Sequence, residues 1–187
     1  MKINFKSFTY SILIALFVNV STFGQINLEE MDIQTLQQGY KTGKFTVSQV
    51  VEAYIKRIEE IDQNGPKLNS VIMVNPDALT RAKELDILLK KNKKMGGMFG
   101  VPVLLKDNLD THDKMPTTAG SRALMNSFPL KDSKVAEQLR DANAIILGKT
   151  NLSEWANFRG QKSSSGWSGL GGQTKNPYVT DCNPCGS

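Results

Sequence analysis

Short apolar runs alternate with segments of helical periodicity along most of the chain, and this alternation constrains the fold more than any other feature. The apolar runs have the length of buried strands and lie at residues 71–74, 101–105 and 144–147. The helical segments lie at residues 33–39, 46–61, 75–89 and 133–142, and a further helix is expected near Asn151. Strands that alternate with helices predict an α/β fold in which helices cover a sheet.

The segment at residues 46–61 carries a helix signal of its own. Thr46 followed by Gln49 is a capping box, in which each side chain accepts a hydrogen bond from a backbone amide at the start of the helix. Apolar residues then recur at helical spacing: Val47, Val50, Val51, Tyr54, Ile58 and Ile61. We expect this face to pack on the core, and a helix that binds a partner protein is the alternative. In the next helix, Asn75 and Pro76 are expected to form the cap and the first turn.

The first 24 residues have the layout of a secretory signal peptide. Lys2 and Lys6 precede an apolar run at residues 11–18, and small residues stand at the −3 and −1 positions of a cleavage after Gly24. The run is shorter than the roughly 20 residues of a membrane-spanning helix. We therefore expect export of residues 25–187, without a stable membrane anchor after cleavage, and in a bacterium this means the periplasm or the extracellular space. An uncleaved anchor is the alternative.

The charge of the chain does not indicate a nucleic-acid partner. Removal of residues 1–24 lowers the formal charge from +5 to +3, because two lysines and no acids are lost. A dense basic cluster is formed by Lys90, Lys91, Lys93 and Lys94. It contains no aromatic residue on which a nucleic-acid base could stack. We expect this cluster to be a solvated helix end, and we expect no binding of nucleic acid.

Cys182 and Cys185 form a lone C-x-x-C pair, and His112 is the only histidine. A zinc site needs two ligands more than this pair supplies, so we expect no metal and no cofactor. Asn183 and Pro184 place the pair in a turn, which argues against a redox-active helix. A disulfide between the two thiols stays possible in an oxidising compartment.

Two known motifs are incomplete in this chain. Residues 148–150 (GKT) lack the first glycine of a phosphate loop, since Asn143 occupies that position. Residues 166–169 (GWSG) lack the closing glycine of a nucleophile elbow, which is replaced by Leu170. His112 is the only candidate base for Ser-His-Asp catalysis, and we expect it to lie in a loop instead.

Lys106 follows the apolar run at residues 101–105. A lysine at this position either faces solvent at the end of a strand or lies in a dry site, and periodicity alone favours solvent. Burial disfavours the ammonium form and makes a lysine a base near neutral pH. Such a base removes a proton from a serine directly or through a second hydroxyl group, as in Ser-Lys variants of the catalytic triad.

Residues 160–187 are rich in glycine and serine and poor in aliphatic residues. A flexible linker has this composition. The segment also contains larger side chains that a linker does not need: Trp167, Gln173, Asn176 and Tyr178. We therefore expect a backbone-lined loop around a small-molecule site.

Several blocks of the sequence, in order, resemble the amidase signature family. Residues 100–108 (GVPVLLKDN) resemble its lysine segment, and residues 148–156 (GKTNLSEWA) resemble its next block. Residues 165–168 (SGWS) and 171–178 (GGQTKNPY) resemble the approach to the signature, and residues 184–187 (PCGS) resemble its opening. The resemblance implies the N-terminal part of the amidase signature fold, a mixed sheet covered by helices and truncated within the signature.

The resemblance also implies roles for individual residues. Lys106 matches the general base, and Ser187 matches the serine that bridges base and nucleophile and has an unusual cis peptide bond. The nucleophilic serine lies further along the family sequence and outside this chain, so we expect the chain alone to be inactive. Asp107 and Asn108 either orient the lysine or cap the next turn. Three serines are expected to face the substrate: Ser163, Ser164 and Ser165.

An amidase of this family hydrolyses the C–N bond of a carboxylic amide through a Ser–cis-Ser–Lys mechanism. The resemblance implies a small-molecule amide or a C-terminal peptide amide as substrate, and the SGWS run is most similar to the peptide-amidase branch. One alternative is a non-catalytic, truncated product that binds ligands or partners. The other is a glutamine amidase like the catalytic A-type component of the tRNA-dependent amidotransferase, against which the signal peptide argues.

Overall fold

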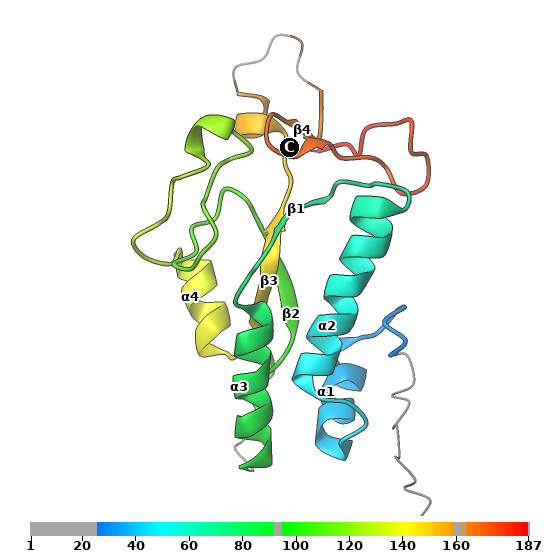
Figure 1. The fold of residues 1–187 in the computed structure, drawn as a ribbon, viewed down its shortest axis with the longest axis vertical. Coiled ribbons are helices and arrows are strands. Elements are labelled where there is room, and N and C mark those ends of the chain that lie inside the picture. Colours follow the sequence, from blue (N-terminus) through cyan, green and yellow to red (C-terminus); the bar gives the residue numbers. More distant parts are fainter. Residues whose placement is uncertain (1–25, 92–94, 159–161, 163, 187) are drawn as a thin grey trace, which may run out of the picture.

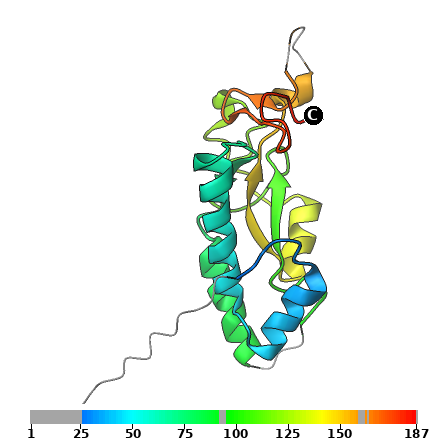
Figure 2. The ribbon, with the colours of Figure 1, turned by 90° about the vertical axis from the view of Figure 1, so that its right-hand side faces the viewer.

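A three-stranded sheet lies at the centre of the protein, between helices on both faces (Figures 1 and 2). The computed structural model describes residues 26–91, 95–158, 162 and 164–186, so the predicted signal peptide and Ser187 lie outside the described residues. The strands are β1 (Val71–Val74), β2 (Pro102–Lys106) and β3 (Ile145–Thr150), in the order β1–β3–β2. Because β1 is antiparallel and β2 parallel to β3, the predicted mixed sheet is confirmed.

Helices α2 (Val47–Arg57) and α3 (Ala78–Lys90) pack on one side of the sheet, and α1 (Ile33–Thr42) lies below the sheet, next to the loop that leads into β2 (Figure 2). The predicted capping box at the start of α2 is confirmed, because the Gln49 amide donates to Thr46 Oγ1 at 3.2 Å and the Thr46 amide donates to Gln49 Oε1 at 2.8 Å. A π-helix (Ile58–Asn64) continues α2 and ends before Gly65.

The larger apolar core lies between these helices and the sheet. It contains the apolar face of α2, as predicted, together with the buried side of α3 and two residues of β3. Its fully buried side chains, at 0% exposure, are Val47, Val50, Val51, Ala82, Leu85 and Ile145. Burial of this apolar surface is the main stabilising contribution on this side of the sheet.

Helix α4 (Lys134–Asp141) covers the opposite face of the sheet (Figure 2). The Ala136 amide donates to the side chain of the N-cap residue Ser133. The core under α4 is smaller, and its buried members are Leu105, Met115, Ala136 and Ile146. Arg140 of α4 also forms ion pairs with Asp113 and Asp132 in the segment that leads from β2 to α4, at 2.7 and 2.9 Å.

Two predicted helix starts are wrong. Helix α3 begins at Ala78 and has Asp77 as its N-cap residue, whereas Asn75 and Pro76 lie in the turn before it, where Asn75 Oδ1 accepts from the Asp77 amide and the Asn75 side-chain amide donates to the Ile146 carbonyl. The helix expected near Asn151 is only a 3₁₀ segment, Glu154–Asn157, in which Trp155 and Ala156 have φ of 49° and 53°. A right-handed helix cannot continue through residues with positive φ.

A bulge in the pairing of β2 with β3 changes the direction of the side chains near the end of β3. Val103 pairs with Ile146, but the next pair is Leu104 with Gly148. Ile145 and Leu147 belong to the core under α2 and α3, whereas Lys149 points to the other face. Bulges redirect side chains in this way.

Gly148 lies so close to β1 that a Cβ atom there would be 2.2 Å from the Met73 carbonyl oxygen.

Beyond the sheet, β4 (Trp167–Ser168) and β5 (Gly172–Gln173) form a short antiparallel hairpin. Within the described ranges, no helix has the length and apolar character needed to cross a membrane.

Candidate active site

Lys106 is the last residue of β2, and it pairs with Thr150, the last residue of β3. In a sheet with parallel strands, ligands bind beyond the carboxyl ends of the strands. Lys106 is partly buried. Its exposure is therefore intermediate between the two environments considered from the sequence, a solvent-facing strand end and a dry site. Three segments surround this edge of the sheet, at residues 107–120, 151–153 and 164–186, and together we call them the polar cap (Figure 1).

Asp107, directly after Lys106, organises the first segment of the polar cap. Its side chain is 1% exposed. The backbone amides of Thr118 and Gly120 donate to the carboxylate at 3.3 Å each, and the Thr118 hydroxyl group donates to it as well. The interpretation that Asp107 caps the next turn is therefore wrong, since it binds a turn eleven residues further along. Asn108 is exposed.

The turn held by Asp107 contacts the β4–β5 hairpin. The Leu170 amide donates to the Gly120 carbonyl at 2.9 Å. Gly120 has φ of +76°, and a Cβ atom there would lie 2.5 Å from the Cβ of Ser168. Only glycine fits this left-handed conformation and close approach. A continuous set of contacts thus runs from the residue beside Lys106 to the hairpin.

Asn151, directly after β3, holds the hairpin from the other side. Its Oδ1 accepts a hydrogen bond from the Ser168 hydroxyl group at 2.7 Å. Its side-chain amide donates to the Gly172 carbonyl at 3.1 Å and to Thr174 Oγ1 at 2.9 Å. Within the glycine- and serine-rich segment, residues 168–174 therefore form a hydrogen-bonded structure and not a flexible linker.

Ser153 fixes the part of the chain that leads to Ser187. Its hydroxyl group is fully buried, accepts from the Gly166 amide at 2.8 Å and donates to the Gly186 carbonyl at 3.3 Å. The Ser165 hydroxyl group donates to the same carbonyl. A hollow of about 190 Å³ lies here and is lined by Asn151, Leu152, Ser153, Gly166, Thr174, Pro184, Cys185 and Gly186.

The structure describes two of the three serines of the predicted substrate loop, Ser164 and Ser165. Ser163 lies outside the described residues, and the Ser164 hydroxyl group donates to Gln173 Oε1 at 2.9 Å. Ser165 binds the carbonyl of the residue before Ser187. That these serines face a substrate stays a prediction, as do the roles of Lys106 and Ser187.

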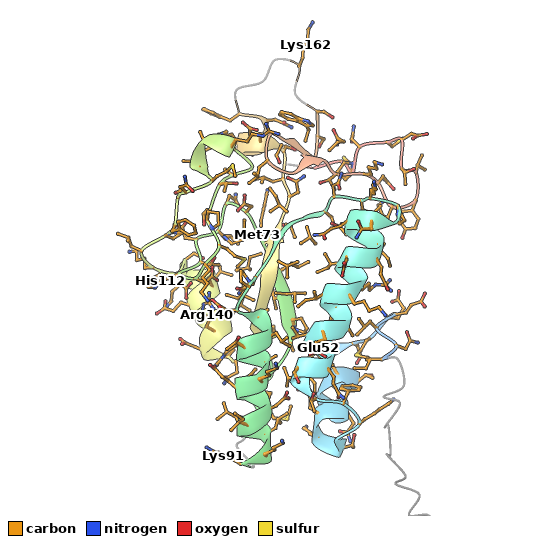
Figure 3. All side chains as sticks on the ribbon, in the orientation of Figure 1. Glu52, Met73, Lys91, His112, Arg140 and Lys162 are labelled. Carbon is orange, nitrogen blue, oxygen red and sulfur yellow. The ribbon has the colours of Figure 1, made fainter. Side chains whose placement is uncertain are left out.

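The histidine and the two cysteines form none of the side-chain hydrogen bonds described above for Asp107, Asn151 and Ser153. His112 lies in an exposed loop, as predicted, on the same side of the molecule as Arg140 and well away from Lys162 (Figure 3). Cys182 and Cys185 are both exposed and are free thiols. Of the two, Cys185 lines the hollow beside Ser153.

The sequence did not predict the burial of Lys149. Its side chain is fully buried, and its ammonium group donates to the Leu109 carbonyl at 2.6 Å and to Thr117 Oγ1 at 3.2 Å. Periodicity gives no sign of this, because only the bulge in β3 turns Lys149 toward the 107–120 segment. As a motif, the GKT run at residues 148–150 indicates no more than an incomplete phosphate loop.

A sequence model described as Amidase matches residues 49–187. The chain belongs to the amidase signature family. It is 42% identical, over 181 residues, to a protein of Arabidopsis thaliana named as a probable amidase, with 92% of this chain and 35% of that protein covered. It is 37% identical to the A-type subunit of the glutamyl-tRNA(Gln) amidotransferase of Alkaliphilus metalliredigens, with coverages of 87% and 31%.

The fold agrees with this membership. The crystal structure of the native peptide amidase from Stenotrophomonas maltophilia superposes with a TM-score of 0.81 and 47% sequence identity, over 84% of this chain and 32% of that one. The predicted amidase signature fold is thus confirmed. The chain spans about a third of the length of these relatives.

Proposed function

We propose that this chain supplies the base and the bridging serine of an amidase that hydrolyses carboxylic amides, C-terminal peptide amides among them. One observation carries the proposal. Lys106, at the carboxyl end of β2, lies at the same edge of the sheet as the hydrogen-bonded loop that leads to Ser187. The 47% identity to a peptide amidase supports this choice of substrate.

In the proposed mechanism, the neutral Lys106 amine accepts a proton from the Ser187 hydroxyl group. This hydroxyl group in turn takes the proton of the nucleophilic serine, whose oxygen attacks the amide carbonyl carbon. The nitrogen of the tetrahedral intermediate takes the proton back from the Lys106 ammonium group through the Ser187 hydroxyl group, so that the C–N bond breaks and ammonia leaves. Water then attacks the acyl-enzyme, which releases the carboxylic acid and restores the serine hydroxyl group. Backbone amides near the nucleophile stabilise the negative oxygen of the intermediate.

The nucleophile is proposed to lie in sequence beyond Ser187. The coverage of about a third of each relative supports this idea. Sequencing of the gene past the codon for Ser187 tests it, and we expect a glycine-rich segment that contains the nucleophilic serine. A stop codon at this point would contradict the proposal and favour a non-catalytic binding protein.

The substrate class is tested with the protein encoded by the whole gene. Release of ammonia is measured with a C-terminal peptide amide, a free amino-acid amide, an aryl amide and glutamine. We expect hydrolysis of the peptide amide without any partner subunit. No turnover of the first three amides would overturn the proposal.

A glutamine amidase is the second candidate, because the chain is 37% identical to the A-type subunit of an amidotransferase. This candidate predicts hydrolysis of glutamine that depends on partner subunits, and little hydrolysis of the peptide amide. The same measurement therefore separates the two functions.

Export is a further part of the proposal, based on the signal-peptide layout of residues 1–24. N-terminal sequencing of the protein from its natural host checks it. We expect a mature chain that starts at Gln25 outside the cytoplasm. A cytosolic protein that retains Met1 would contradict export and strengthen the second candidate.

A further inference from the structure

The carbonyl group of Gly186 accepts hydrogen bonds from two serine side chains. The Ser153 hydroxyl group donates to it at 3.3 Å, and the Ser165 hydroxyl group donates to it as well. A carbonyl oxygen has two lone pairs, so these two donors use its full capacity. Ser187 follows Gly186 directly in the sequence, and it is the serine that we propose to bridge base and nucleophile.

The backbone of Gly186 does not by itself fix the direction of this carbonyl group. Its φ is +121°, a conformation that residues with a side chain rarely adopt. Among the described residues, none except its neighbours in the chain has an atom within 4 Å of the position of a Cβ atom on Gly186. Glycine also has the widest choice of backbone conformations. The two serine hydroxyl groups therefore provide the hydrogen bonds that select one direction for the carbonyl group.

Ser153 is firmly anchored between β3 and the segment that contains Ser165. It is 0% exposed, and its carbonyl accepts from the Ala156 amide at 2.7 Å. Its hydroxyl oxygen also accepts from the Gly166 amide at 2.8 Å. The same side chain thus binds Gly186 and the residue next to Ser165, so both donors are placed relative to each other.

Ser165 is held beside the 184–186 segment by its own neighbours. The Gln173 side-chain amide donates to the Ser165 carbonyl at 2.8 Å. Gly166 has φ of +77°, and a Cβ atom there would lie 2.6 Å from Pro184 Cγ. Only glycine allows this conformation and this close approach. The Ser165 hydroxyl group therefore reaches Gly186 from a fixed position.

The rigidity of the peptide group transmits this constraint to the next residue. A peptide group is planar, so one plane contains the Gly186 carbonyl group and the nitrogen and Cα atoms of Ser187. Hydrogen bonds that fix the carbonyl direction also fix the direction in which the chain enters Ser187. A hydroxyl group that relays a proton must lie within hydrogen-bond reach of both of its partners.

We propose that Ser153 and Ser165 are positioning residues that hold the Gly186 carbonyl group and so orient Ser187 for proton transfer. This inference rests on the role proposed for Ser187. Both serines act through Gly186 and need no contact with the substrate for this purpose.

The kinetic test uses the protein encoded by the whole gene, with a C-terminal peptide amide as substrate. Ser165→Ala removes one donor to Gly186 and leaves the hydrogen bond between Gly166 and Ser153 in place. We expect kcat to fall about tenfold with unchanged KM, because only the orientation of Ser187 is affected. Ser165→Thr keeps a hydroxyl group and should regain most of the rate. Ser153→Ala combined with Ser165→Ala should lower kcat about 10²-fold, as small misplacements of reacting groups do.

Ser164→Ala is the matched control. Ser164 is the adjacent serine, and its hydroxyl group donates to Gln173 Oε1 at 2.9 Å instead. This variant should keep the kcat and the KM of the unmodified sequence.

The Gly186 carbonyl group is also observed directly by NMR, in protein labelled with ¹³C at the glycine carbonyl carbons and with ¹⁵N in serine. Only a serine that follows a glycine then gives a signal, and within the 187 residues these are Ser121 and Ser187. The signal of Ser187 is identified by its loss in Ser187→Ala. We expect its carbonyl shift to change in Ser165→Ala and to stay the same in Ser164→Ala, with the Ser121 signal unmoved in both.

An unchanged kcat in Ser165→Ala and in the double variant, while Ser187→Ala is inactive, would overturn the inference. A higher KM at unchanged kcat would overturn it as well, because Ser165 would then contact the substrate. If the double variant does not fold, the kcat and the carbonyl shift of Ser165→Ala decide alone. Full amide hydrolysis by Ser187→Ala would instead refute the proposed function, and the inference with it.

Discussion

The helical layer of α1, α2 and α3 and the polar cap are stabilised by different interactions. The helical layer is stabilised by apolar side chains that are removed from water, such as Val50 and Leu85. The polar cap is held by polar side chains that bind backbone groups, foremost Asp107, Asn151 and Ser153. The comparison indicates that the helical layer supplies most of the stability, whereas the polar cap determines the shape of the candidate site.

The polar cap achieves its order without leaving polar groups unpaired. Asp107, Thr118, Ser153 and Ser168 are all buried. In the described part of the chain, every buried side-chain nitrogen or oxygen atom has a hydrogen-bond partner. A buried polar group that loses its partner costs about 1–3 kcal/mol. A single substitution that removes one partner in the polar cap should therefore destabilise the segments that this partner held.

The largest expected effect on stability comes from the helical layer. Leu85→Ala should lower the free energy of unfolding by about 2–5 kcal/mol, because it removes a fully buried side chain and leaves a cavity. Chemical denaturation measures this change. Ile87→Ala in the same helix is the control, since Ile87 is 53% exposed, and an equal loss in both variants would contradict the account.

A smaller and local effect is expected in the polar cap. Asn151→Ala removes the hydrogen bonds to Ser168, Gly172 and Thr174 and should cost about 1–3 kcal/mol. Hydrogen exchange should show faster exchange in residues 164–186 and unchanged protection in α2 and α3. Gln138→Ala, at an exposed amide of α4, is the control. Uniform loss of protection in both regions would refute the division.

The smallest expected effect concerns the start of α2. Thr46→Ala removes the side chain that accepts from the Gln49 amide and should destabilise the protein by about 1 kcal/mol. Thr46→Ser keeps the hydroxyl group and should restore most of this loss. Thermal unfolding of both variants checks the prediction, and equal melting temperatures for them would argue against the capping box as a stabilising element.

The helical layer was largely predictable from the sequence, because its signals are local. The capping box at Thr46 and the apolar face of α2 depend on neighbours within a few residues, and the structure confirms both. Outside this layer, the strand at residues 71–74 and the helix predicted at residues 133–142 are confirmed for the same reason. The family blocks also identified Lys106 as the residue to examine at the edge of the sheet.

The polar cap could not be predicted in the same way. Asp107 binds a turn eleven residues away, and the Trp155 amide donates to the Ala119 carbonyl within a left-handed turn. Lys149 is buried only because a bulge in β3 reverses the alternation of its side chains. Such features depend on contacts between distant segments, which periodicity does not contain.

The central claim is that Lys106 acts as the base of an amidase, and one rate comparison tests it most directly. In the protein encoded by the whole gene, ammonia release from a C-terminal peptide amide is compared between the unmodified sequence and Lys106→Met. Lys114→Met, at an exposed lysine paired with Asp77, is the control. We predict a loss in kcat of about 10²–10⁴-fold for Lys106→Met, the usual contribution of a general base, with unchanged melting temperature and full activity in the control. Equal rates for Lys106→Met and the unmodified sequence would contradict the claim.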